Sequence, residues 1–360
     1  MQFPRRPDYK TVATTWAHGT TYQLPISREF WLESAWIGIH FTAAAVAPTS
    51  PTAEGFANLI KNVRMSVTDA TGNRKVIDMT GSAIQEYARQ VIGGVDRNAT
   101  LLCSPNSAGV FPTPAAQAYV LWFPIFFRDP LLEDPMGAAT MLALPRLTSD
   151  PTLEITIGAA ADIASNTASV ITTPGRLVVA LNRRDVLIPN FPTIPCELIT
   201  YEKAWNSAGG KQDWEIPPIG TVTRILIQDF VGGTANGGLR KTVLGSGSTS
   251  DEIGQDWSLE YLSTVIRRSP PNFIMSENDV ANELYPATWN NMLGSYLWDF
   301  LTDYPPAGAF SLGSCLDLNP LSLNGGKARI IGSSLVTTAN SITRFTVHKM
   351  YGDLRAVKFV

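Results

Sequence analysis

Both halves of the chain carry the same landmarks in the same order. Each half has a β-patterned run that ends in tryptophan, at Trp16 and Trp205, and then a short motif with proline, YQLP at residues 22–25 and WEIP at residues 214–217. A longer β-patterned segment follows, at residues 31–41 and 221–230. A repeat of this length indicates that one structural unit occurs twice. The sequence therefore predicts two domains.

The later landmarks also keep their order. Three pairs of β-patterned segments continue the repeat, at residues 119–123 and 296–300, 153–157 and 328–331, and 176–180 and 344–348. Each half also has a helix-start signal, in which Ser82 precedes Gln85 and Ser276 precedes Asp279 by three residues. A serine N-cap with a polar residue at N3 is typical of a capping box, so we predict one short helix in each half.

The repeat and the prolines together predict the domain organisation. Residues 1–10 form an N-terminal arm, residues 11–188 a first domain and residues 196–360 a second. The connector at residues 189–195 contains Pro189, Pro192 and Pro195. Because proline fixes its own backbone angle, we expect this connector to be stiff and extended.

The local patterns favour antiparallel β-structure. Residues 221–227 (TVTRILI) are rich in β-branched residues and alternate apolar with polar positions, while the sequence DATGN at residues 69–73 is typical of a hairpin turn. The predicted fold is all-β, with two tandem eight-stranded antiparallel jelly rolls and a short helix in each. The glycine-rich segment at residues 231–254 is expected to be a surface loop.

Composition excludes several classes of function. Only 16% of the residues are charged, against roughly 25% in an average soluble domain. The formal net charge is −3, so the chain lacks the excess of Lys and Arg that is typical of proteins that bind nucleic acid. Arg5, Arg6 and Lys10 form a small basic cluster on the arm, which fits either a solvated terminus or a contact with anionic lipid. We expect no membrane span, no signal peptide and three free thiols.

The sequence offers little material for catalysis. His18, His40 and His348 are far apart and do not form an H-x-H pattern, and no phosphate-binding loop or nucleophile elbow is present. Asp129, Glu133 and Asp134 are clustered in one turn, which fits either a divalent cation or plain solvation. We therefore predict no catalytic residues and no cofactor, and these three acids are the weak candidates for a metal site.

The tandem jelly rolls, the capped helices, the low charge and the missing active-site motifs resemble one family. It is the double jelly-roll major capsid proteins of tailless, membrane-containing icosahedral phages, the tectivirus-like lineage. The resemblance spans about residues 11 to 357, on the motifs at 22–25 and 214–217, the Ser82 and Ser276 helices, and the Leu121-Trp122 and Leu297-Trp298 strands.

That resemblance implies a homotrimer with a pseudo-hexagonal outline that tiles an icosahedral shell over an internal lipid membrane. It implies a protein made in the host cytoplasm and located in the virion, and no enzyme. Its partners would be further copies of itself, neighbouring capsomers, minor capsid and vertex proteins and viral lipid, without direct contact to nucleic acid. Arg5, Arg6 and Lys10 would then face anionic head groups.

Two other functions remain open from the sequence. Peptide N-glycanases also pair two jelly rolls, and Trp205, Asp213, Trp214 and Glu215 are the candidate residues for such a carbohydrate-active site. The other alternative is a receptor-binding module of a phage fibre. Such a module more often has a coiled stalk or glycine-rich repeats, and the chain has neither.

Overall fold

The computed structural model describes most of the chain, and its contacts divide the chain into two units. The first unit comprises Met1–Ser104, Phe111–Ile199 and Met350–Val360, and the second comprises Pro105–Val110 and Thr200–Lys349. The residues that the structure describes are 5–46, 52, 54–70, 72–92, 98, 102–103, 113–132, 136–164, 170–185, 191–205, 210–231, 239–240, 256–269, 295–300, 315–318, 326–334 and 341–351.

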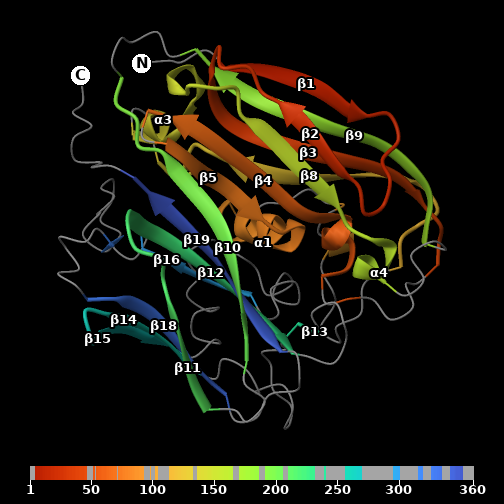
Figure 1. Cartoon of the computed structure of the whole chain (residues 1–360). Coiled ribbons are helices and arrows are strands. Elements are labelled where there is room, and N and C mark those ends of the chain that lie inside the picture. Colours follow the sequence, from red (N-terminus) through yellow and green to blue (C-terminus); the bar gives the residue numbers. More distant parts are fainter. Residues whose placement is uncertain are drawn as a thin grey trace. The chain divides into compact units, whose positions relative to one another are not determined.

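The long strands of the first unit form two groups of four, which are labelled in Figure 1. In one sheet the order is β1-β9-β3-β6, and the short strand β7 pairs with the beginning of β3. In the other sheet the order is β5-β4-β8-β2. The strands are β1 (Arg5–Ala13), β2 (Thr21–Pro25), β3 (Trp31–Ala43), β4 (Ile60–Asp69), β5 (Gly72–Met79), β6 (Ala118–Phe126), β7 (Leu142–Ala143), β8 (Thr152–Ile157) and β9 (Ile171–Arg184).

The helices of the first unit are short, and they lie between strands. They are the 3₁₀ helices η1 (Gly55–Leu59) and η2 (Leu144–Arg146) and the α-helices α1 (Gly81–Ile92), α3 (Met136–Thr140) and α4 (Ala160–Ile163). The longest, α1, connects strands β5 and β6 and packs against η1, β4 and β6. All but one of its twelve residues are buried.

The second unit also contains two sheets of four long strands. One sheet has the order β10-β19-β12, with β16 and the short strands β13 and β17 paired to β12. The other has the order β11-β18-β14-β15. The strands are β10 (Cys196–Ala204), β11 (Gly210–Glu215), β12 (Thr221–Val231), β13 (Leu239–Arg240), β14 (Asp256–Tyr261), β15 (Thr264–Ser269), β16 (Ser295–Asp299), β17 (Leu316–Asp317), β18 (Ala328–Ser334) and β19 (Ile342–Met350).

The two units have the same strand order, which confirms the repeat. If the long strands of each unit are numbered one to eight along the chain, the sheets in both units have the orders 1-8-3-6 and 5-4-7-2. The short strands β7 and β17 both pair with the first residues of strand three. The backbone N–H groups of Trp16 and Trp205 both donate to carbonyls near the start of the eighth strand, Gly175 within β9 and Ser341 just before β19. All five pairs of segments matched in the sequence therefore occupy equivalent strands.

The burial of the strands follows the sequence pattern that predicted them. Along β8, every second side chain is buried, as expected where one face of a strand meets the core. The predicted hairpin at residues 69–73 is present as β4 and β5, with Asp69 opposite Gly72 and a positive φ of 127° at that glycine. Glycine adopts such a backbone angle without steric cost, which is why the turn forms there.

Two boundaries differ from the predictions. Helix α1 begins at Gly81, and its N-cap is Thr80, whose Oγ1 accepts the N–H of Ala83 at 3.2 Å. Ser82 was the wrong choice because the helix starts at Gly81, two residues earlier than an N-cap at Ser82 implies, and Ser82 is buried within its first turn. Strand β1 runs from Arg5 to Ala13, so no element boundary falls at residue 10. The helix predicted at Ser276 and most of the 231–254 loop lie outside the described residues.

The contact boundary between the units falls inside β10, after Ile199. Leu198 and Ile199 belong to the first unit and pair in parallel with Ile77 and Asp78 of β5. The other pairings with a determined register are antiparallel. In the described part of the chain, no helix is long and apolar enough to cross a bilayer.

Candidate functional site

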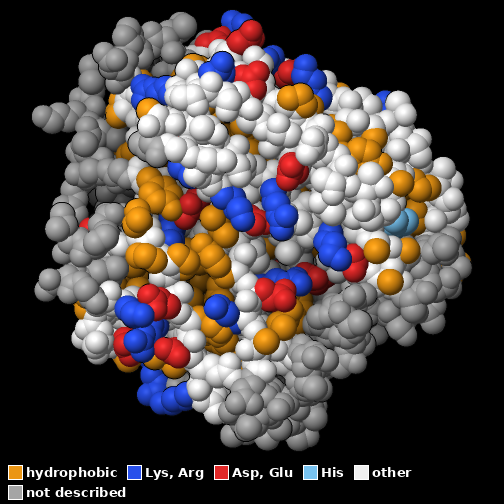
Figure 2. All heavy atoms as spheres, in the orientation of Figure 1, with side chains coloured by type: hydrophobic (Ala, Val, Ile, Leu, Met, Phe, Trp, Pro, Cys, Tyr) orange, Lys and Arg blue, Asp and Glu red, His pale blue; other side chains and the backbone are white. Residues whose placement is uncertain are grey.

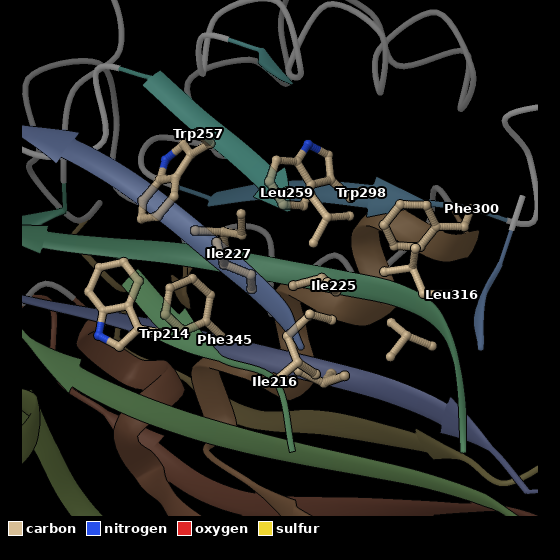
Figure 3. Packing of buried hydrophobic residues seen from close by; sticks show 14 of the residues in the cluster. Trp214, Ile216, Ile225, Ile227, Trp257, Leu259, Trp298, Phe300, Leu316 and Phe345 are labelled. Carbon is tan, nitrogen blue, oxygen red and sulfur yellow. The ribbon is translucent and has the colours of Figure 1, made fainter. Parts of the chain in front are cut away.

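The two tryptophans proposed for a carbohydrate site belong to the core of the second unit. Trp205 and Trp214 are buried and pack with Trp257 and Phe345, with ring centroids 4.9–6.1 Å apart. Figure 3 shows the rings of Trp214 and Phe345 side by side and Trp257 nearby, among aliphatic side chains from several strands. These aromatic rings stabilise the unit by packing and present no face to a ligand.

The two acids proposed for the same site are separated from those rings by the strand geometry. Asp213, Trp214 and Glu215 are consecutive in β11, and successive side chains of a strand point to opposite faces of the sheet. The Asp213 carboxylate lies 3.2 Å from the guanidinium of Arg329 in β18, and Glu215 is paired with Lys327, the residue before β18. Both acids are about half exposed. The residues therefore lie on two faces and form no acid-and-tryptophan site.

The histidines serve structural roles in the strands and their connections. The Nδ1 atom of His18 lies 2.9 Å from the carbonyl oxygen of Gly158, and that of His348 contacts the hydroxyl of Thr223. Burial, with a smaller effect from the charge of Arg176, holds the pKa of His40 below its ordinary value. Among the described residues, no group of three His, Cys, Asp or Glu side chains is placed to hold a metal ion.

Of the three acids in the predicted metal turn, the structure describes Asp129. This residue is buried, and its Oδ1 accepts the backbone N–H of Leu131 at 3.0 Å while its own N–H donates to Thr140 Oγ1. Such contacts are typical of an aspartate that stabilises a turn. Glu133 and Asp134 lie outside the described residues, so the metal site stays a prediction.

The basic cluster lies on β1 at the edge of a sheet. More than half of the side chain is exposed in each of Arg5, Arg6 and Lys10, and each is paired with an acid. The Arg6 guanidinium lies 2.9 Å from Asp185, and the Lys10 ammonium lies 3.2 Å from Asp8. Ion pairs with an exposed cation are weak, so the charged groups of Arg6 and Lys10 remain accessible to a competing anion.

Arg5 is held differently, by a carboxylate that it shares with Arg184. Both guanidinium groups donate two hydrogen bonds to Glu33, at 2.9 and 3.0 Å. Burial raises the pKa of the Glu33 carboxyl, but the hydrogen bonds and charges of Arg184 and Arg5 outweigh it and place the pKa below its ordinary value. The carboxylate therefore joins β1, β3 and β9 as a charged structural centre.

On the face that Figure 2 shows, the described charged side chains do not form a large region of one sign. Figure 2 shows acidic and basic side chains next to one another on the face in view, with hydrophobic side chains between them. The large hydrophobic side chains that are exposed among the described residues are Tyr9, Val46, Ile92, Ile219, Leu262, Val265 and Ile266. The last three lie within five residues of one hairpin, which the sequence analysis did not single out. Its signal was the run Thr264-Val265-Ile266, which lacks the alternation expected of a strand with one buried face.

Comparison with known proteins gives matches at the level of structure. No protein-family model matches the chain, and no curated protein matches its sequence. The major capsid protein of Sulfolobus turreted icosahedral virus superposes with a TM-score of 0.66 and 12% identity, covering 98% of each chain. The fold is a double jelly roll.

Two further double jelly rolls match over almost their whole length. The major capsid protein P2 of bacteriophage PM2 has a TM-score of 0.54 and 12% identity, with 96% of this chain and 98% of that chain covered. The Faustovirus major capsid protein has a TM-score of 0.56 and 10% identity, with 97% and 90% covered. At such identities the double jelly roll is shared as a fold, and the predicted fold class is confirmed.

Proposed function

We propose that this chain is the major capsid protein of an icosahedral virus and is located in the virion. The observation that carries the proposal is the fold match over nearly the full length of both chains to capsid proteins of three different viruses. A match over one jelly roll would say little, because that fold serves many functions. A double jelly roll that matches over nearly the whole of both chains is a much narrower class.

The finer proposal is a homotrimer with a pseudo-hexagonal outline that tiles the shell above an internal membrane. Its support is the repeat itself, because three copies with two equivalent units each would present six similar faces. The low fraction of charged residues agrees with a protein whose sides are covered by copies of itself. Neighbouring capsomers, minor capsid and vertex proteins and viral lipid are the proposed partners, and no catalytic role is proposed.

The mass and outline of the purified protein test this function. Three copies of 39.1 kDa weigh about 117 kDa, and sedimentation velocity separates such a species from the monomer. Negative-stain microscopy of the same fraction is expected to show particles with a nearly hexagonal outline. A monomer at micromolar concentrations, or a dimer with two-fold views only, would contradict the proposal.

A further inference from the structure

Strands β1 and β9, which lie side by side in Figure 1, place four arginines opposite one another in two consecutive pairs. Arg5 lies opposite Arg184, and Arg6 lies opposite Arg183. Side chains that lie directly opposite in an antiparallel sheet share a face, and like charges in such a place repel each other. Successive residues of a strand point to opposite faces, so each pair occupies a face of its own. Each pair therefore needs a negative group to compensate it.

The first pair shows how one oxyanion satisfies two such arginines. The two oxygens of the Glu33 carboxylate accept four hydrogen bonds from Arg5 and Arg184, at 2.9 and 3.0 Å. Planar guanidinium groups form this bidentate geometry with phosphate as well as with carboxylate. Glu33 thus provides, within the chain, an example of the anion geometry that suits a pair of arginines on these strands.

The second pair has no such shared carboxylate among the described residues. Arg6 is paired with Asp185 at 2.9 Å. Arg183 lies 3.7 Å from Asp8, and Asp8 lies closer to Lys10, at 3.2 Å. Arg6, Asp8 and Lys10 alternate along β1 and therefore share the face of Arg183. Three cations meet two carboxylates there, which leaves one positive charge without compensation.

Arg183 is held in place while its hydrogen-bond donors stay unused. Its guanidinium lies over the ring of Phe30, with the Cζ atom 4.7 Å from the ring centroid. The 3.7 Å contact with Asp8 is too long for a hydrogen bond, and the Nε atom is buried with no hydrogen-bond partner. The side chain is still 28% exposed. A guanidinium fixed on an aromatic ring loses little further entropy when it binds an anion.

We propose that Arg6 and Arg183 bind a phosphate group between them, with Lys10 as a further cation at the site. A phosphate monoester carries about two negative charges at pH 7 and offers three acceptor oxygens, so it compensates this face as Glu33 compensates the other. Arg6 can turn to the phosphate because its ion pair with Asp185 is exposed and weak. The phosphate site goes beyond the proposed function. Its assignment to the head group of an anionic lipid rests on that function, in which the shell lies above a membrane.

Titration of the full-length protein with inorganic phosphate tests the site. A ligand that binds the folded state raises the melting temperature, and the concentration dependence gives the dissociation constant. Sodium chloride keeps the ionic strength constant. Phosphate also stabilises folded proteins in general by exclusion from their surface, so a control variant has to provide the baseline.

The variants are Arg183→Gln and Arg6→Gln, and the control is Arg64→Gln. We expect each of the first two to weaken phosphate binding at least about tenfold, because each removes charge-assisted hydrogen bonds to the anion. Arg64 is also an exposed arginine paired with an acid, Asp78, and its replacement should leave the phosphate response unchanged. The Arg6 side chain is 68% exposed, so Arg6→Gln tests the site even if Arg183→Gln fails to fold.

Chemical modification locates the bound phosphate. Phenylglyoxal reacts with accessible guanidinium groups, and mass spectrometry of the digested protein identifies the modified arginines. Phosphate should slow the modification of Arg6 and Arg183 and leave that of Arg64 unchanged.

Vesicles identify the source of the phosphate. Phosphatidic acid in a phosphatidylcholine bilayer presents a phosphate monoester at a lipid surface. If the wild type binds these vesicles, and Arg6→Gln and Arg183→Gln lose this binding while Arg64→Gln keeps it, the ligand is a lipid head group. If inorganic phosphate protects both arginines and the vesicles do not bind, the site stands for free phosphate and the lipid contact is contradicted.

The outcomes also separate the site from the capsid proposal. The site is overturned if neither inorganic phosphate nor the vesicles distinguish the Arg6 and Arg183 variants from Arg64→Gln. Sedimentation of the wild type decides the capsid proposal independently. A trimer that fails the phosphate test overturns the site alone, and a monomer that passes it overturns the capsid proposal alone.

Discussion

At the scale of single residues, the charges of this protein work mainly as structural links between strands. Glu33 binds the guanidinium groups of Arg5 and Arg184, and these three residues come from β3, β1 and β9. Asp78 has a similar place in the other sheet of the first unit. Burial raises the pKa of its carboxyl, but the side chains of Lys75, Asn62 and Arg64 outweigh burial and place the pKa below its ordinary value.

Replacement of Glu33 by glutamine is expected to reduce stability and part of its pH dependence. A carboxyl with a lowered folded pKa contributes stability that is complete above its unfolded pKa of 4.5 and is lost as the pH falls through the folded value. At pH 7 we expect a loss of about 2 kcal/mol, mostly through the partly buried Arg184 contact, since more than half of the Arg5 side chain is exposed. Urea unfolding from pH 7 to pH 3 measures both effects.

The control for Glu33 is Glu154→Gln. Glu154 accepts a hydrogen bond from Gln23 at 3.0 Å in an exposed place. Its replacement should cost no more than about 0.5 kcal/mol. Equal losses in the two variants would show that the shared carboxylate has no special role. Because the pKa of Asp78 is also below its ordinary value, the Glu33→Gln variant should still lose some stability at acid pH.

A second residue with a clear expectation is Ile219, in the turn between β11 and β12. Its φ of 74° lies in the left-handed region, where a β-branched side chain is strained. Ile219→Asn should therefore stabilise the protein by about 1 kcal/mol, because asparagine tolerates this conformation. Thermal unfolding gives the comparison, with Ile219→Val as the matched variant that keeps the branch. Identical melting temperatures for the two variants would argue against strain at this position.

At the scale of elements, glycine allows aromatic rings to approach two strands closely. A Cβ atom on Gly38 of β3 would lie 2.8 Å from Trp122 and from Val178. On Gly332 of β18 it would lie 2.6 Å from the ring of Trp257 and 2.8 Å from that of Trp205. Glycine inside a strand often marks such a close approach.

Gly332→Ala is expected to destabilise the second unit by about 2 kcal/mol, because the added methyl group overpacks a core of rigid rings. A double-mutant cycle with Trp257→Phe identifies the cause. The smaller ring should relieve the clash, so the alanine should cost about 1 kcal/mol less in the Trp257→Phe background. Chemical unfolding of the four proteins supplies the values, and equal costs in both backgrounds would assign the loss to the strand backbone instead.

The sequence predicted the elements more fully than the contacts between them. Alternation and turn residues are local signals, and they placed the matched strands and the 69–73 hairpin correctly. The N-cap of α1 was misplaced because both Thr80 and Ser82 are favourable cap residues, serine slightly more so, and only the fold selects Thr80. The Glu33 centre joins residues up to 151 positions apart, and the covered edge of β5 joins residues over 100 apart. No local pattern encodes such pairings.

At the scale of the whole molecule, the basic residues of β1 give the proposed membrane contact a direct test. Arg6 and Lys10 are the accessible members of the cluster, whereas Arg5 is engaged by Glu33. Reversal of both charges, with Arg6→Glu and Lys10→Glu, should weaken binding to phosphatidylglycerol vesicles by at least about tenfold, since each basic residue near an anionic surface contributes about 1 kcal/mol. Vesicle flotation measures the bound fraction.

The matched control for the vesicle experiment is Lys61→Glu with Arg64→Glu. These are exposed basic residues of β4 that are also paired with acids. The control should leave vesicle binding unchanged, and added salt should weaken the wild-type interaction. If both double variants lose vesicle binding equally, the loss follows from the change in net charge. That result would contradict a specific contact between β1 and the membrane.

The indole cluster of the second unit has a spectroscopic consequence. Trp205, Trp214 and Trp257 are mutually in contact and shielded from water, and Phe345 completes the group. Chromophores held so close together in fixed orientations couple their electronic transitions, so this half of the chain should contribute an exciton signal to the circular dichroism spectrum. The four described tryptophans of the first unit do not form such a ring cluster in the described contacts. The loss of this signal would therefore report the unfolding of one jelly roll within the intact chain, without any added label.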